Sequence, residues 1–260
     1  MQPSVKYTIF FAAVVCFACS ILVSTAAVVL KDKQDINKVI DQQMKVLTVS
    51  GLVKQGESVP AAEVTRLFEE NLEPVLIDMD TGDVVTGQDP VAYDQRKASR
   101  DPARSRVAEP NPAKVRRVPE VGKIYLKKGA EGVEAIILPV EGMGLWSTLY
   151  GYVALSGDTE TIKGLIFYEH GETPGLGGEV DNPNWKALWP GRKPFDEDGD
   201  VVIKVNKGSA GPVETDPHRV DGLAGATLTA NGVTHLLHYW LGDRGFGPYL
   251  DKVRAERGNS

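Results

Sequence analysis

The sequence predicts an α+β protein: one N-terminal transmembrane helix, then a soluble domain with an antiparallel or mixed sheet and flanking helices. Residues 7–30 form one uncharged apolar run, and residues 122–205 contain several short runs that are typical of strands. After Thr229 the apolar residues recur at helical spacing. Because helical and strand patterns do not alternate one by one, the sequence favours α+β over a doubly wound α/β fold.

Composition limits the class of protein. Hydrophobic residues make up 42% of the 260 residues and charged residues 25%, as in a globular protein, so most of the chain should fold. The net charge of −6 argues against a nucleic-acid partner. The two cysteines, Cys16 and Cys19, both lie in the apolar run, where we interpret them as small residues of a membrane helix. A disulfide scaffold or a cysteine-ligated iron–sulfur cluster in the soluble part is therefore excluded.

The run from Tyr7 to Leu30 is 24 residues long. At about 1.5 Å per residue it crosses a hydrocarbon core of about 30 Å. A cleaved signal peptide is the alternative, but the run exceeds the roughly 7–15 residues of a signal core. We therefore expect a short tail at residues 1–6 and a retained transmembrane helix at residues 7–30. Lysines flank the run on both sides in similar number, so the sequence does not fix its orientation.

Residues 31–121 are expected to form a membrane-proximal α+β region. Apolar spacing predicts a helix over Asp35–Val53 and a short helix over Pro60–Phe68, followed by a β-hairpin over Glu73–Val85. Residues 88–119 are rich in arginine, lysine and proline and poor in large apolar residues. This basic segment predicts a long surface loop, which either stays solvated or touches a partner or a membrane surface.

Residues 122–260 are expected to form a second, β-rich domain that ends in a helix. The run Leu149–Leu155 alternates between apolar and other residues, which predicts a half-buried strand. The remaining expected strands are 123–128 and 134–140, joined by a hairpin turn at 129–132, then 162–168 and 201–205. The helix after Thr229 carries one apolar stripe, made of Val233, Leu236, Leu237, Trp240 and Leu241.

Several chemical motifs are absent from the sequence. No G-x-G-x-x-G follows a strand and no P-loop is present, so a doubly wound nicotinamide site is not expected. The four histidines lack the carboxylate and histidine spacing of a metal site, and no nucleophile elbow is present. We therefore expect neither a metal site nor a catalytic side chain in this chain.

One motif does point to chemistry: residues 221–229, DGLAGATLT, directly before the last helix. A flexible glycine turn that leads into a helix N-terminus gathers unpaired N–H groups and the positive end of the helix dipole, which suits a phosphate. Thr227 places a hydroxyl at this point, and Thr229 is expected to be the N-cap. A plain helix cap with no ligand is the alternative.

This stretch resembles the flavinylation signature D-x-x-(S/T)-G-A-(T/S) of the FMN-binding domain family. The resemblance implies that Thr227 takes FMN through a phosphoester bond, which leaves the flavin ring free for redox chemistry. Ala224 departs from the pattern, because the family often has Ser or Thr there; if that hydroxyl helps the attachment enzyme, attachment would be slower. The other signature residues expected at the cofactor are Asp221, Gly222, Gly225 and Ala226.

Residues 142–152 and 172–178 extend the resemblance, within this family, to the flavin subunit of sodium-translocating NADH:quinone reductases. It implies an electron-relay role without an NADH site and a soluble domain on the periplasmic side of a bacterial inner membrane. The implied partners are the other subunits, the lipid bilayer and a flavin attachment enzyme that uses FAD and magnesium. Trp146, Thr173 and Leu176 are the candidates to surround the ring, against the alternative that Trp146 and Leu176 are core residues.

Two alternatives remain open at this point. One is the homologous flavin subunit of an Rnf-type ferredoxin:NAD reductase complex, which is expected to be shorter before residue 122. The other is a membrane-anchored binding or sensor module that carries no flavin.

Overall fold

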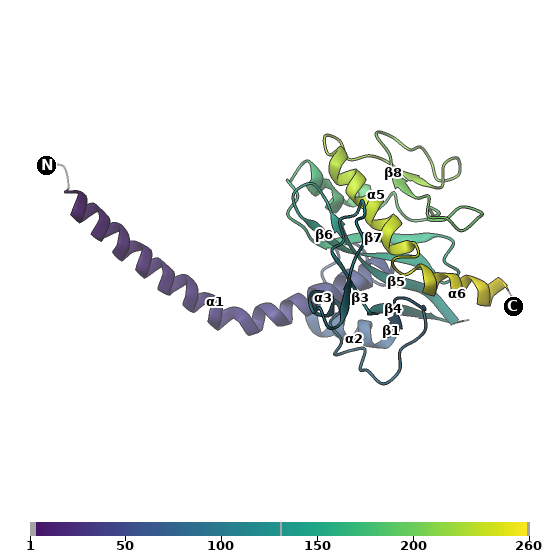
Figure 1. Cartoon of the computed structure of the whole chain (residues 1–260), viewed down its shortest axis with the longest axis horizontal. Coiled ribbons are helices and arrows are strands. Elements are labelled where there is room, and N and C mark those ends of the chain that lie inside the picture. The colour runs from purple at the N-terminus through teal and green to yellow at the C-terminus, as the bar shows by residue number, and fades with distance from the viewer. Residues whose placement is uncertain (1–3, 131, 259–260) are drawn as a thin grey trace. The chain divides into compact units, whose positions relative to one another are not determined.

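A computed structural model describes residues 4–130 and 132–258 (Figure 1). The expected N-terminal tail therefore lies partly outside the described residues, as does Glu131 in the expected hairpin turn. The chain divides into two units, Met1–Gln42 and Gln43–Ser260. The first unit is helical from Val5 onward, and the second contains the sheet.

Helix α1, Val5–Val49, is the only helix among the described residues that is long and apolar enough to cross a membrane. Its most apolar 18-residue window has a mean hydropathy of 2.5 and no buried residue, unlike the core helix of a soluble protein. The expected separate helix at Asp35–Val53 is instead the continuation of α1, because Lys31-Asp32-Lys33-Gln34 contains no helix breaker. The helix ends at Val49, and Gly51 then adopts a φ of +77°.

The second unit is built on a five-stranded antiparallel sheet with the strand order β1-β4-β5-β6-β7. This architecture confirms the expected α+β class. Strand β1 lies before residue 121 and pairs with β4, so segments from both sides of the expected domain boundary share one sheet. The strands are β1 Leu72–Asp78, β4 Val121–Gly129, β5 Gly132–Met143, β6 Thr148–Ser156 and β7 Ile162–Glu169.

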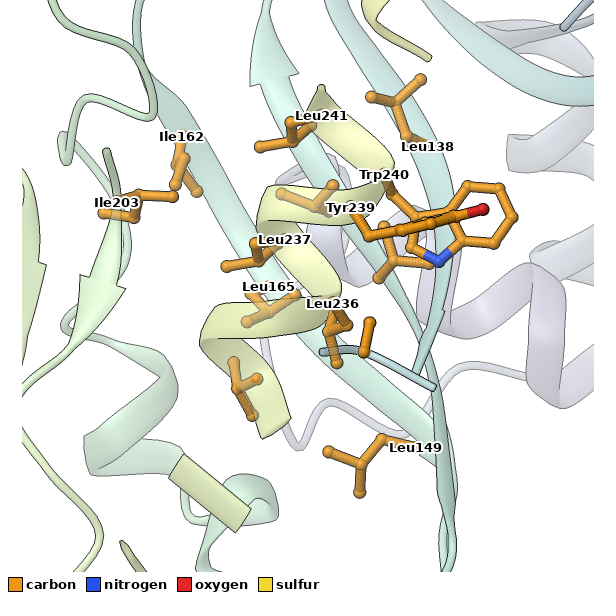
Figure 2. Packing of buried hydrophobic residues seen from close by; sticks show 14 of the residues in the cluster. Leu138, Leu149, Ile162, Leu165, Ile203, Leu236, Leu237, Tyr239, Trp240 and Leu241 are labelled. Atoms are coloured by element: carbon orange, nitrogen blue, oxygen red, sulfur yellow. The ribbon is translucent and has the colours of Figure 1, made fainter. Parts of the chain in front are cut away.

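Helix α5, Thr227–Leu241, covers one face of this sheet (Figure 2). Helix α6, Gly247–Gly258, follows it in the chain. The contact is close: a Cβ placed on Gly142 of β5 would lie 2.6 Å from Cβ of Leu236. The expected apolar stripe of the helix is confirmed, since all of its members are buried. They are Val233, Leu236, Leu237, Trp240 and Leu241.

The opposite face of the sheet is also covered. The end of α1 packs on β7, where a Cβ on Gly164 would lie 3.2 Å from the Val49 side chain. Helix α2, Ala61–Asn71, adds an edge-to-face contact between Phe68 and Tyr125, with ring centroids 5.4 Å apart. The expected half-buried strand is therefore wrong for β6, in which residues 151–156 are all buried. Its alternating residues meet two different layers rather than a core and solvent.

The basic segment, residues 88–119, is more ordered than a plain surface loop. Arg96 donates two hydrogen bonds to the Glu169 carboxylate, at 2.6 and 2.7 Å, and its guanidinium lies 3.7 Å from the Tyr150 ring centroid. Side chains of the segment also enter the core, among them Ala98, Ala113 and Val118. Its elements are α3 Gln95–Arg100, β2 Ser105–Val107 and β3 Arg117–Pro119. The segment packs on the sheet domain through these contacts.

Short elements connect β7 to α5. The expected strand over 201–205 is reduced to β8, Lys204–Val205, and a single bridge between Phe195 and Val201. Strand β8 pairs in parallel with β9, Arg219–Val220, which brings the following residues beside the loop at 206–211. The other elements are the 3-10 helix η1, Gly177–Asp181, and α4, Pro183–Lys186.

A carboxyl group on β5 provides a pH-dependent test of this packing. Burial raises the pKa of Glu141, and the nearby Arg96 and Arg100 offset this only in part. The folded chain therefore binds the Glu141 carboxyl proton more tightly than the unfolded chain does. Stability falls as pH rises from the unfolded pKa of this group through its folded pKa. Glu141→Gln is expected to raise the melting temperature at pH 8 and to leave it nearly unchanged near pH 4. Thermal unfolding of the full chain in detergent measures this, with Glu69→Gln on the exposed side of α2 as control.

Candidate functional site

Three loops meet at the N-terminus of α5: residues 144–147 after β5, residues 171–176 after β7, and residues 221–226 before the helix. Glu172 joins them. Its carboxylate accepts hydrogen bonds from the backbone N–H groups of residues 145, 146 and 147, at 3.1, 2.9 and 3.1 Å. It also accepts one from the Thr229 hydroxyl in α5, at 2.6 Å. One buried side chain therefore bonds to two segments that are distant in sequence.

The Glu172 carboxylate stays charged although it is buried. Burial on its own would raise its pKa, but the bonds from Thr229 and from the three N–H groups outweigh this and lower the pKa below its usual value. The surroundings leave no spare room. A Cβ on Gly144 would lie 2.7 Å from Oε1 of Glu172, and a Cβ on Gly177 would lie 2.5 Å from Oγ1 of Thr229. Only glycine fits at these two positions in the observed packing.

Helix α5 begins at Thr227, three residues earlier than expected, and Ala226 is its N-cap residue. The expected N-cap role of Thr229 is wrong: its side chain is fully buried and bonds to Glu172 rather than to the start of the helix. The helix starts early because Gly225 adopts a φ of +70° and turns the chain directly before it. No side chain caps the first turn, and Thr227 is exposed at the first helical position.

The signature residues before the helix form a tight turn. Asp221 accepts hydrogen bonds from the Ala210 N–H at 2.7 Å and from the Ser209 hydroxyl at 3.3 Å, so it holds the neighbouring loop. A Cβ on Gly222 would lie 2.4 Å from the carbonyl oxygen of Asn206. These two residues therefore have clear structural roles in placing the turn.

The three ring candidates all lie on the surface of this site. Trp146 is 69% exposed and Leu176 is 46% exposed. The alternative that these two side chains belong to the core is therefore wrong. Leu176 lies against the signature, because a Cβ on Gly225 would be 3.1 Å from its Cδ2. Thr173 is exposed, and its carbonyl accepts the Leu176 N–H at 3.1 Å. Two more exposed apolar side chains lie at the site, Leu145 on the first loop and Leu228 in the first turn of α5.

The site offers an exposed hydroxyl at an uncapped helix N-terminus, with exposed aromatic and aliphatic side chains on the neighbouring loops. Free N–H groups and the helix dipole stabilise a phosphate, and apolar side chains accept a flat ring. Sequence reasoning did not single out Glu172, which lies in a stretch that stood out only through its resemblance to the family. Its partners are 25 to 57 residues away, so no local pattern reveals its role.

The class of protein follows from a family match over this site. The FMN-binding domain family matches residues 144–242, a range that includes all three loops and the whole of α5.

The curated relatives cover almost the full chain. The C subunit of the Na(+)-translocating NADH-quinone reductase of Vibrio anguillarum is 51% identical over 97% of this chain and 96% of its own length. The same subunit of Pseudomonas aeruginosa is 45% identical, with 97% of each chain covered. The crystal structure of Shewanella oneidensis NqrC has a TM-score of 0.75 at 35% identity and covers 83% of this chain and 97% of its own. The chain belongs to the family of Na(+)-translocating NADH-quinone reductase C subunits.

Proposed function

We propose that this chain is the electron-carrying flavoprotein subunit of a sodium-translocating NADH:quinone reductase, with FMN bound through a phosphoester to Thr227. One observation carries the proposal: Thr227 is exposed at the uncapped start of α5, on a turn that contacts the exposed Leu176. The signature in the sequence and the family of the chain support it.

Different residues of the site would hold the phosphate and the ring of the cofactor. The first turn of α5 would face the phosphate with its N–H groups and dipole, and Gly225 and Ala226 would let the backbone approach. Trp146, Thr173 and Leu176 would surround the ring. Bound in this way, the flavin supplies one- and two-electron redox chemistry, which the phosphoester leaves intact.

The membrane anchor and the partners follow from the same proposal. Helix α1 would cross the bilayer of a bacterial inner membrane and hold the soluble domain on the periplasmic side, next to the other subunits of the complex. A flavin attachment enzyme would act on the exposed signature. Relatives that are named as the C subunit and match over 97% of the chain support this function over that of an Rnf-type flavin subunit.

The experiment is co-expression of the full chain with the attachment enzyme, followed by a denaturing gel under ultraviolet light and intact-mass measurement. We expect a fluorescent band and a mass increase of one FMN less one water. Thr227→Ala should abolish both, and Thr227→Ser should retain them because it keeps the hydroxyl. Thr86→Ala, which removes an exposed hydroxyl outside the three loops of the site, is the matched control and should stay fluorescent.

Two results would contradict the proposal. Fluorescence that persists in a folded Thr227→Ala chain would move the attachment elsewhere. A wild-type chain without flavin, expressed with an attachment enzyme that modifies a known target, would favour the binding or sensor module.

A further inference from the structure

The Glu172 carboxylate makes a bond to each side of the proposed flavin site. Its Oε1 accepts the N–H groups of Trp146 and Ser147, and its Oε2 accepts the Leu145 N–H and the Thr229 hydroxyl. The first three donors belong to the loop that carries Trp146. The fourth belongs to the helix turn that carries Thr227.

We propose that Glu172 is the positioning residue of the flavin site, which fixes the loop of Trp146 relative to Thr227. The inference rests on the proposed function, because the positioning role of Glu172 presupposes a cofactor on Thr227. Thr227 and Thr229 share the first turn of one helix, so a bond that fixes Thr229 also fixes Thr227.

Only a carboxylate can satisfy this set of donors. Each oxygen faces at least one backbone N–H group, which can donate but cannot accept. A glutamine has one carbonyl oxygen and one amide NH2, so in either orientation its NH2 meets a backbone N–H group and leaves it without an acceptor. The Thr229 hydroxyl can reverse its role, but the loop cannot. Glu172→Gln should therefore release the loop while it keeps the size of the side chain.

The neighbouring backbone leaves the Glu172 carboxylate little room to move. A Cβ on Gly144 would lie 2.7 Å from Oε1, and a Cβ on Gly177 would lie 2.6 Å from Oε2, so backbone encloses it on two sides. The backbone of Glu172 is also held, since its N–H donates to Nδ1 of His170 at 3.2 Å. The other ring nitrogen of His170 lies 2.8 Å from the Asp181 carboxylate.

Two readouts separate positioning from general stability. Iodide quenching in the flavin-free chain reports the exposure of Trp146, because the other three tryptophans are buried. A Trp146→Phe chain gives the background. The initial rate of flavin attachment, measured with the attachment enzyme, reports whether loop and helix are correctly placed for the cofactor.

The variants are expected to give different results. Glu172→Gln should alter iodide quenching of Trp146 and slow attachment by roughly tenfold, the factor that the loss of one charge-assisted hydrogen bond represents. Thr229→Val should slow attachment but leave quenching near wild type, because the three N–H bonds to Glu172 remain. Thr229→Ser keeps the hydroxyl and should restore the wild-type rate.

Glu179→Gln is the matched control, since it removes a nearby carboxylate that bonds to Asn182 instead of the Trp146 loop. It should change neither readout. A folded Glu172→Gln chain with wild-type quenching and attachment would overturn the inference, as would an attachment rate unaffected by Thr229→Val. If the wild-type chain takes no flavin, the proposed function fails, and Glu172 does not position a flavin site. A change of iodide quenching in Glu172→Gln would then show only that Glu172 holds the Trp146 loop.

Discussion

Replacing Trp240 by alanine is expected to lower the free energy of unfolding by about 3–5 kcal/mol, as for other large aromatic side chains in a core. Trp240 is 1% exposed and lies between α5 and the sheet (Figure 2). Its ring contacts Phe246, with centroids 5.6 Å apart, and its Nε1–H donates to the carbonyl of Glu141 at 2.6 Å. The substitution removes both the packing and the bond that ties α5 to β5.

The matched control is Trp240→Phe, which keeps most of the buried ring and removes the donor. Its expected cost is smaller, about 1–3 kcal/mol, because the Glu141 carbonyl loses a partner in a buried place. Urea unfolding of the full chain in detergent, followed by circular dichroism, measures both variants. A loss in Trp240→Ala no greater than in Trp240→Phe would show that the packing of α5 contributes little to stability.

The parts of the fold that the sequence predicted are those set by local periodicity. The stripe from Val233 to Leu241 needs only the helical repeat to be visible, and the structure buries all of it. The strands over 123–140 and 162–168 were equally visible, because alternating side chains and a glycine turn lie within one short window. These features do not depend on which other segment covers them.

What the sequence could not predict depends on distant partners. Strand β6 is buried on both faces because α5 covers one side and the end of α1 the other. The residues Leu149–Leu155 alone do not indicate that either helix covers the strand. The basic segment was expected to be a surface loop because it is rich in arginine, lysine and proline and poor in large apolar residues. Arg96 instead finds Glu169, 73 residues further along the chain.

The same limit applies to the candidate site. Thr227 and its glycine turn were visible as a contiguous motif, and the structure places this turn directly before the last helix, as expected. The helix start was misplaced because Thr229 is a good N-cap residue by type, whereas its hydroxyl is taken by Glu172. The exposure of Trp146 and Leu176 contradicts their usual burial, and such a departure from local rules is what a binding surface requires.

Gly222→Ala is expected to cost about 3 kcal/mol of stability, the upper end of the usual cost of overpacking, and to displace the turn before Thr227. Gly225→Ala should be milder. At Gly222 a Cβ would lie 2.4 Å from the Asn206 carbonyl oxygen and 2.8 Å from the Gly208 nitrogen. Both are backbone atoms, so the loop itself must move. That movement also lengthens the bond from the Gly222 N–H to the Gly208 carbonyl, now 2.8 Å.

At Gly225 the problem is conformational rather than steric. Its φ of +70° costs an alanine about 1–2 kcal/mol, while the nearest atom is the tip of Leu176, 3.1 Å away, which can turn aside. Urea unfolding of the two variants, alongside the rate of flavin attachment, tests the difference. We expect Gly222→Ala to be the less stable and to slow attachment more, because the shift of the 206–208 loop disturbs the turn that leads to Thr227. The reverse order of stability would show that backbone strain at Gly225, and not the packing of Gly222, holds the turn in place.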